Sequence, residues 1–158
     1  MGGTSGSSIP SRWSFLLSAA LLGVAFTVGV ALAMTATDQA LFCGSCHAMA
    51  EAALTHKRSV HAKLACNECH APHALTAKVP FKIQEGTRDI FATVSRRIPD
   101  LIHPGPETKA VTQTNCLRCH GETVGTVNMV VKPYCTDCHR HVPHTPKIPL
   151  SQRSAADV

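Results

Sequence analysis

Eight cysteines carry most of the chemistry that this sequence could perform, and all eight lie in four copies of one motif, Cys-x-x-Cys-His. The paired cysteines are Cys43 and Cys46, Cys66 and Cys69, Cys116 and Cys119, and Cys135 and Cys138. This motif is typical of the covalent attachment of c-type haem. Two thiols three positions apart lie close together on one helical turn, where they can form thioethers to the two haem vinyl groups, and the adjacent His can reach the iron.

Zinc is the main alternative for these cysteines. Nineteen residues separate Cys46 from Cys66 and fifteen separate Cys119 from Cys135, and both spacings suit a zinc site built from paired cysteines. A four-cysteine zinc site does not need the His that follows all four motifs, although only 10 of the 158 residues are His. No cysteine is left over for a disulfide or a free thiol. The sequence therefore predicts four covalently bound haem c groups.

The composition also favours a domain packed around a cofactor. Aromatic residues are 4% of the 158-residue chain, which is few for a domain of this size, because aromatic side chains supply much of the buried surface of a core. The net charge of +5 is small and scattered, with no basic stripe, so it does not indicate nucleic-acid binding. We expect a mainly α fold, with one N-terminal transmembrane helix and a small haem-packed multihaem cytochrome c domain with little or no sheet.

An uncharged segment at residues 13–37 contains an apolar core, residues 14–34, that is long enough to cross a bilayer as a helix. Arg12 precedes it and Asp38 follows it, so the positive-inside rule places the cysteine-bearing part in the periplasm of a bacterial cytoplasmic membrane. Residues 31–33 also match a signal-cleavage site, but the apolar core of a signal peptide is only about 7–15 residues long. We expect a cytoplasmic stub at 1–13, an uncleaved anchor at 14–34, a periplasmic tetrahaem domain at 35–150 and a disordered tail at 151–158.

The segment between the second and third motifs predicts one amphipathic helix, bracketed by Pro80 and Pro99. Its apolar side holds Ile83, Ile90, Phe91, Val94 and Ile98, and its charged side holds Lys82, Glu85, Asp89, Arg96 and Arg97. This helix could lie at the membrane surface or pack on haem as an ordinary surface helix. Lys82 and Asp89 are two helical turns apart, so they share a face that could bind a quinol hydroxyl and take its proton, or could simply be a solvated charge stripe.

Four six-coordinate haems need eight axial ligands, of which the motifs supply His47, His70, His120 and His139. His61 lies five residues before Cys66 and His144 lies five residues after His139, and either could cap a haem of the other motif pair. Met49 could replace His47 at the first haem, although the residues alone leave His47 as the ligand. The sequence assigns no role to the remaining histidines, which are His56, His73, His103 and His141.

One N-terminal anchor followed by four haem motifs resembles the NapC/NirT family of tetrahaem quinol dehydrogenases. The resemblance covers residues from about 14 to 147, and the segment at 43–49, which ends in Met49, is most similar to the small membrane subunits that serve a cytochrome c nitrite reductase. It implies that the protein oxidises menaquinol and passes electrons to a periplasmic multihaem nitrite reductase catalytic subunit (NrfA-like), which makes ammonia.

The resemblance also implies roles for individual residues. Met49 takes the place of His47 at the first haem, Asp89 blocks the other face of that haem, and Lys82 is the quinol-site lysine. The second haem, on His70, would take its sixth ligand from the partner subunit. His61 and His144 would then serve the haems on His120 and His139.

Two other functions stay open from the sequence. The chain could be a NapC-like quinol dehydrogenase that feeds another periplasmic reductase, or a passive electron shuttle without a quinol site. In each case it is an electron-transfer subunit in the lipid bilayer. If the acceptor is the nitrite reductase, the terminal nitrite reduction belongs to that partner. Small residues recur every four positions in the anchor, at Ala19, Gly23, Thr27 and Ala31, which permits close helix contacts and an oligomeric complex.

Overall fold

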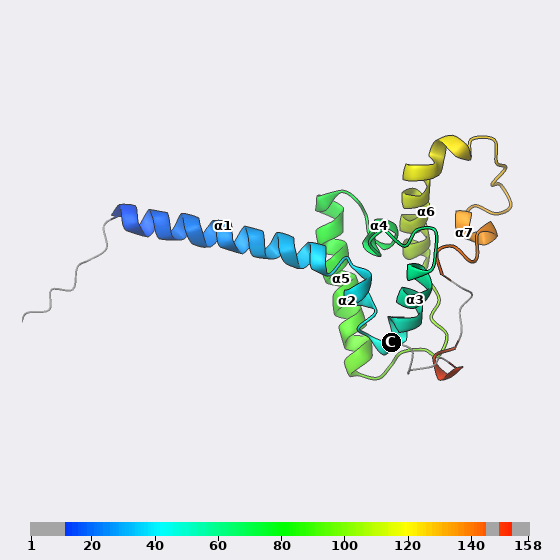
Figure 1. The fold of residues 1–158 in the computed structure, drawn as a ribbon, viewed down its shortest axis with the longest axis horizontal. Coiled ribbons are helices and arrows are strands. Elements are labelled where there is room, and N and C mark those ends of the chain that lie inside the picture. Colours follow the sequence, from blue (N-terminus) through cyan, green and yellow to red (C-terminus); the bar gives the residue numbers. More distant parts are fainter. Residues whose placement is uncertain (1–11, 145–148, 153–158) are drawn as a thin grey trace, which may run out of the picture. The chain divides into compact units, whose positions relative to one another are not determined.

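The computed structural model describes residues 12–144 and 149–152, and the described chain is helical and contains no strand. The chain divides into two compact units, Met1–Thr37 and Asp38–Val158 (Figure 1). The mainly α fold expected from the sequence is confirmed. The expected stub at 1–13 and tail at 151–158 lie largely outside the described residues.

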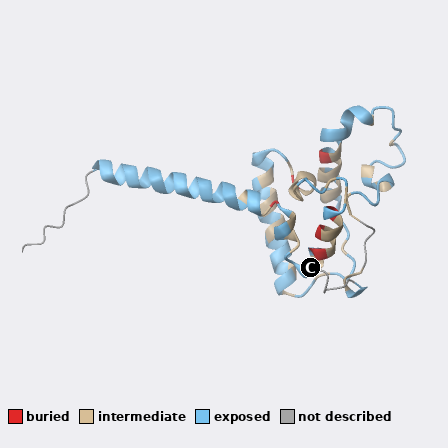
Figure 2. Ribbon diagram, in the orientation of Figure 1, coloured by how far each residue is buried: buried red, intermediate tan, exposed pale blue. Residues whose placement is uncertain are grey.

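The first unit is one long helix, α1 (Arg12–Ala36), which begins two residues before the expected anchor and ends two residues after it. It is the one helix of the described residues that is long and apolar enough to cross a membrane, and all of its side chains are exposed or nearly so (Figure 2). The hydroxyls of Thr27 and Thr35 donate to the carbonyls of Gly23 and Ala31, at 2.8 and 3.1 Å. These bonds satisfy the hydroxyls without water, as an apolar environment requires.

The second unit holds short helices joined by irregular segments. They are α2 (Ala40–Cys43), α3 (His47–Lys57), α4 (Asn67–His70), α5 (Leu75–Val94), α6 (Pro106–His120) and α7 (Cys135–Cys138), with single 3-10 turns at Gly121–Thr123 and Leu150–Gln152. Each haem motif lies at a helix end or fills a one-turn helix (Figure 1).

The long helix α5 differs from the sequence prediction at both ends. It begins at Leu75, so Pro80 lies inside it rather than in front of it. Proline is tolerated in the first turn of a helix, because the first four N–H groups have no intrahelical acceptor. Pro80 is the sixth residue of α5, so the helix lacks one backbone hydrogen bond there. The helix ends at Val94, so Arg96, Arg97 and Ile98 lie beyond it and do not belong to its two faces.

A Schellman motif ends α5. The N–H of Arg96 donates to the carbonyl of Thr93 at 3.2 Å and that of Arg97 donates to Ala92 at 2.9 Å. This geometry needs a left-handed residue after the cap, and Arg96 has a φ of 53°. Glycine adopts this conformation at a lower energetic cost, because the Cβ of any other residue in a left-handed conformation crowds the following carbonyl oxygen.

Arg96→Gly is therefore expected to stabilise the second unit by about 1 kcal/mol. Thermal unfolding of the detergent-solubilised protein would measure the change. Ser95→Gly is the matched control, because Ser95 has an ordinary right-handed conformation with a φ of −80° and should lose stability on the same substitution. An Arg96→Gly melting temperature at or below the unsubstituted value would contradict this reading of the helix end.

The second unit buries little of its own apolar surface. Its buried apolar residues are the small Ala50, Ala53 and Ala71, and no large side chain of the described residues is fully buried (Figure 2). Along α5, Ile83 and Ile90 are 65% and 67% exposed. A stable domain of this size needs a larger apolar core, so the polypeptide is built to pack against something else.

Candidate functional site

The first and second haem motifs meet through their leading cysteines. Cys43 ends α2 and Cys66 precedes α4, and their thiols are hydrogen-bonded to one another. The bond from Cys66 lowers the pKa of Cys43 to about 7, and the same contact, with burial, raises the pKa of Cys66. Gly44 permits the local turn, because a Cβ there would lie 2.9 Å from the Ala40 carbonyl oxygen. Two cysteines with 22 residues between them in the sequence thus lie in contact.

The second and third motifs are joined by one buried amide. Asn115, just before Cys116 on α6, is 6% exposed, and its Nδ2 donates to the carbonyls of Cys69 at 3.0 Å and Ala71 at 2.9 Å. An ion pair between Arg118 and Glu68, at 3.1 Å, adds a surface contact. The amide therefore fixes α6 against the end of α4.

Asn115→Ala is expected to destabilise the second unit by about 2 kcal/mol, because two buried carbonyls lose their donor. Thr114→Ala is the matched control, since Thr114 is exposed and its hydroxyl only bonds to Ala110 one turn back on the same helix. Denaturant unfolding followed by circular dichroism would measure both variants. Equal stability of the two variants would show that Asn115 does not hold the motifs together.

The third and fourth motifs are also in contact. The backbone N–H of Cys135 donates to Oε1 of Gln113 on α6 at 2.7 Å, and the thiols of Cys116 and Cys135 are hydrogen-bonded. The four motifs therefore follow one another in space in their chain order, each touching the next. The spacing of the motifs in the sequence does not predict this spatial order.

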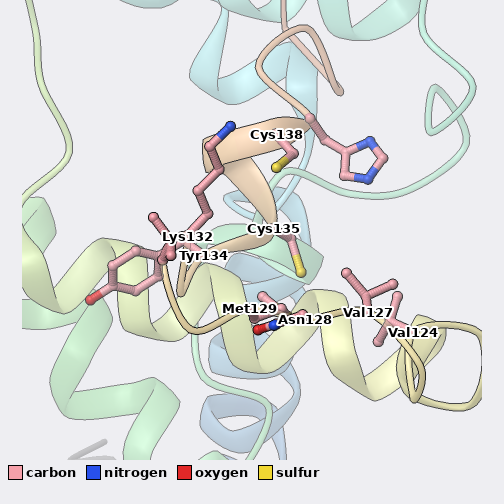
Figure 3. A pocket seen from close by; sticks show the side chains of 10 residues that line it. Val124, Val127, Asn128, Met129, Lys132, Tyr134, Cys135 and Cys138 are labelled. Atoms are coloured by element: carbon pink, nitrogen blue, oxygen red, sulfur yellow. The ribbon is translucent and has the colours of Figure 1, made fainter.

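A pocket of about 190 Å³ opens beside the fourth motif. Figure 3 shows the sulphur atoms of Cys135 and Cys138 on one side of it, with Val124, Val127 and Met129 nearby. His139, the His of this motif, also lines the pocket. An apolar hollow with both thiols and the motif His at its wall suits a covalently attached, largely apolar macrocycle.

Two histidine pairs that include a motif His have the ring spacing that a shared iron would require. The ring centres of His61 and His120 are 6.0 Å apart, and those of His70 and His144 are also 6.0 Å apart. A metal–nitrogen bond is roughly 2 Å and the ring centre lies roughly 1 Å further, so two imidazoles on opposite sides of one metal have centres roughly 6 Å apart. The residues present therefore fit haem iron between these rings.

The chemical state of the rings agrees with this geometry. Burial lowers the pKa of His70 to about 4 and that of His144 below its ordinary value, so both rings are neutral, the form that binds metal. Nδ1 of His144 donates to the carbonyl of Ala52 at 2.9 Å, which leaves Nε2 as the coordinating nitrogen. Nδ1 of His61 and of His56 is buried with no hydrogen-bond partner among the described residues.

His144 lies beside a motif of the other pair, which is the position that the residues alone allowed. The family resemblance implies a different position, at a haem of the third or fourth motif, with His70 completed by the partner subunit. The ring of His144 lies beside His70 and 6.2 Å from His56, because the bond to Ala52 holds it against α3. His56, which had no role in the sequence analysis, is 4% exposed and belongs to this buried cluster.

The predicted quinol-site residues lie on α5, and one of them has an unexpected partner. Nζ of Lys82 lies 2.7 Å from Oδ1 of Asp38, and Nζ of Lys78 lies 2.6 Å from Oδ2. Burial raises the pKa of Asp38, but the hydrogen bonds from Lys78, Lys82 and Asn67 outweigh it and leave the pKa below its ordinary value. From the sequence, Asp38 is only the first charge after the anchor.

The other predicted residues are more open. Asp89 is exposed on α5, seven residues after Lys82, and Glu85 is paired with Arg88. Met49 is 41% exposed on the first turn of α3, and His47, at the start of that helix, is also exposed. The positive charge of Lys82 helps to lower the pKa of the Cys43 thiol, so this lysine lies close to the first motif.

The zinc alternative has no matching geometry in the described part of the chain. No three His, Cys, Asp or Glu side chains converge there as a metal site requires. The cysteines instead meet as thiol pairs between successive motifs.

Comparisons with known proteins point to cytochromes c. Residues 7–103 match the family model "NapC/NirT cytochrome c family, N-terminal region". The chain is 48% identical over 149 residues to cytochrome c nitrite reductase subunit NrfH of Nitratidesulfovibrio vulgaris (strain Hildenborough), covering 94% of each chain. It is 26% identical over 169 residues to the cytochrome c-type protein NapC of Paracoccus pantotrophus, covering 87% of this chain and 71% of that one.

A solved structure is similar as well. It is the crystal structure of a cytochrome c nitrite reductase NrfHA complex bound to the HQNO inhibitor, which matches with a TM-score of 0.79 and 48% identity. The match covers 91% of this chain and 99% of that chain. The extent of these matches, together with four haem motifs in consecutive contact, shows that the chain belongs to the NapC/NirT family of cytochromes c.

Proposed function

We propose that this protein is a membrane-anchored quinol dehydrogenase subunit that oxidises menaquinol and passes the electrons to a periplasmic multihaem nitrite reductase catalytic subunit, NrfA-like. The observation that carries the proposal is the unbroken series of four motifs, which begins beside the Lys82–Asp38 cluster. The similarity to subunit NrfH over 94% of both chains supports the nitrite reductase as the acceptor.

Membership of a cytochrome c family means that the chain carries covalently bound haem c, and we propose four such groups. The eight motif cysteines would hold them, with Met49, His70, His120 and His139 as motif-side ligands and His61 and His144 as distal ligands. The ring pairs support His61 opposite His120 and His144 opposite His70. When bound, haem c supplies reversible one-electron transfer.

The proposed work of the chain at the quinol site is to hold the substrate and move its protons. Oxidation of a quinol releases two protons with two electrons. The Lys82 ammonium would donate a hydrogen bond to a quinol oxygen and stabilise the negative charge that develops there. Asp89, an exposed carboxylate on the same helix, would accept a proton and release it to water.

The orientation in the membrane is part of the proposal. Arg12 before α1 and Asp38 after it favour a cytoplasmic N-terminus and a periplasmic second unit in the bacterial cytoplasmic membrane. The apolar, exposed side of α5 would then meet quinol or lipid at the membrane surface. We propose that the protein works in an oligomeric complex with its acceptor.

The test is a titration of the detergent-purified, oxidised protein. Mass spectrometry should show four haem additions, and a menaquinol analogue should produce the reduced haem spectrum faster than a ubiquinol analogue does. Addition of an NrfA-like catalytic subunit and nitrite should then yield ammonium. If dithionite reduces the protein but neither quinol does, with or without the partner, the protein is a passive electron shuttle rather than a quinol dehydrogenase.

A further inference from the structure

A buried carboxylate outside the predicted site residues lies beside the quinol-site lysine. Asp38 is 8% exposed and accepts three side-chain hydrogen bonds. Lys82 and Asn67 donate to Oδ1, each at 2.7 Å, and Lys78 donates to Oδ2 at 2.6 Å. Both carboxylate oxygens are therefore engaged, and the carboxylate has one orientation.

The donors come from separate parts of the second unit. Asn67 opens α4 in the second motif, whereas Lys78 and Lys82 lie one turn apart on α5. Asp38 itself lies two residues before α2, the helix that ends at Cys43 of the first motif. The carboxylate thus connects α5 to the first two motifs, and it lies close enough to act electrostatically on the Cys43 thiol.

The charges of this cluster do not cancel. Two ammonium groups share one carboxylate, so the cluster carries a net charge of about +1 when all three groups are ionised. The side chains of Lys78 and Lys82 are only 16% and 15% exposed, so solvent screens this charge less than it would screen a surface pair. Such a site favours an electron-rich oxygen over a cation.

A lysine side chain is long and flexible, with about 2 kcal/mol of rotamer entropy, and it cannot hold its ammonium at one point without a partner. Asp38 supplies that partner for Lys82. Lys78 binds the other carboxylate oxygen and Asn67 shares Oδ1 with Lys82, so together they keep the carboxylate from turning away. The exposed Asp89, by contrast, has no such fixed environment.

We propose that Asp38 is a positioning residue of the quinol site, which fixes the Lys82 ammonium for its hydrogen bond to a quinol oxygen. The inference rests on the proposed function, because it assigns Lys82 to quinol. Lys78 and Asn67 hold Asp38 in place, and Lys78 also keeps the cluster positive. Loss of the Asp38 charge should therefore weaken quinol binding more than it slows turnover of bound quinol.

The test measures binding and turnover in the full-length, haem-loaded protein. Asp38→Asn keeps the shape of the side chain but removes its charge, and it is expected to raise both the Kd for HQNO and the KM for a menaquinol analogue about tenfold, with kcat changed less. Asp38→Glu should recover part of the affinity, since it restores the charge. Asp100→Asn is the matched control, because Asp100 is an exposed carboxylate that bonds to Ser151.

Haem content and melting temperature separate positioning from a purely structural role. If Asp38 has a structural role alone, Asp38→Asn would lower the haem content and the melting temperature but leave the HQNO Kd of the folded fraction unchanged. That result would overturn the proposal. If Asp38→Asn does not accumulate with haem, Lys78→Met loosens the same carboxylate, and about a threefold rise in the HQNO Kd is expected. An unchanged Kd in that variant would also overturn the proposal.

Failure of the proposed function would look different. If quinol does not reduce the unsubstituted protein, the proposed function falls. If quinol reduces Lys82→Leu at the unsubstituted rate, Lys82 is not a quinol residue and the role of Asp38 falls with it, whereas the quinol dehydrogenase function stands. If quinol reduction depends on Lys82 but HQNO and quinol bind Asp38→Asn normally, only the role of Asp38 is wrong.

Discussion

Lys82→Leu is expected to slow quinol-driven reduction of this protein by about 100-fold or more, while reduction by dithionite stays unchanged. The reason is that, in the proposed mechanism, the ammonium of Lys82 beside the first motif stabilises a quinol oxygen as its proton leaves. The substitution removes one of the three side-chain donors to Asp38, and Lys78 and Asn67 remain to satisfy that carboxylate. The domain should therefore keep its haem.

Stopped-flow absorbance with a menaquinol analogue would measure the rate, and Lys63→Leu provides the control because Lys63 is exposed. Asp89→Asn is expected to slow the reduction as well. Since Asp89 is exposed, its loss carries little cost in folding, so a slow rate in that variant would point to proton transfer. Reduction of the Lys82→Leu protein at the unsubstituted rate would remove this lysine from the mechanism.

His61→Ala is expected to give the second large effect, the conversion of one haem in four to the high-spin state. The ring of His61 lies 6.0 Å from that of His120, and no other ring contact of His120 is seen among the described residues. Without His61 the iron bound by His120 would keep a single protein ligand. Electron paramagnetic resonance of the oxidised protein would report the change, and nitrite-dependent turnover with the partner should fall.

His144 and His103 complete the experiment. His144→Ala should change the ligation at His70 instead, so the His61→Ala and His144→Ala effects should add in the double variant. His103→Ala is the control, since His103 is exposed. Spectra of the double variant identical to those of either single variant would show that both histidines serve one haem, which would contradict the pairing seen in the structure.

Features that depend on near neighbours in the chain could be predicted from the residues alone. Thioether attachment needs two thiols three positions apart and an adjacent His, so the four motifs could be located from spacing alone. Crossing a membrane needs a continuous apolar run, so α1 was predicted to within two residues at each end. The composition, poor in aromatic residues, likewise predicted that the polypeptide would bury little of its own surface.

The ends of α5 were predicted less accurately, because a helix end depends on several competing effects. The sequence predicts a helix that starts at Pro80, whereas α5 begins five residues earlier. The helix continues through the proline because the loss of one hydrogen bond is small beside the other bonds of a 20-residue helix. The end of the helix was placed too late, since Arg96 adopts a left-handed conformation that sequence patterns assign to glycine.

Contacts between residues far apart in the chain depend on the folded arrangement of the helices. His144 could have approached any of several motifs, and its hydrogen bond to Ala52, 92 residues away, holds it beside His70. Asp38 looked like a charge that ends a membrane segment, but the packing of α4 and α5 surrounds it with Asn67, Lys78 and Lys82. Spacing along the chain fixes chemistry within one helical turn, whereas contacts across 30 to 90 residues depend on how the helices pack, and no local pattern encodes that.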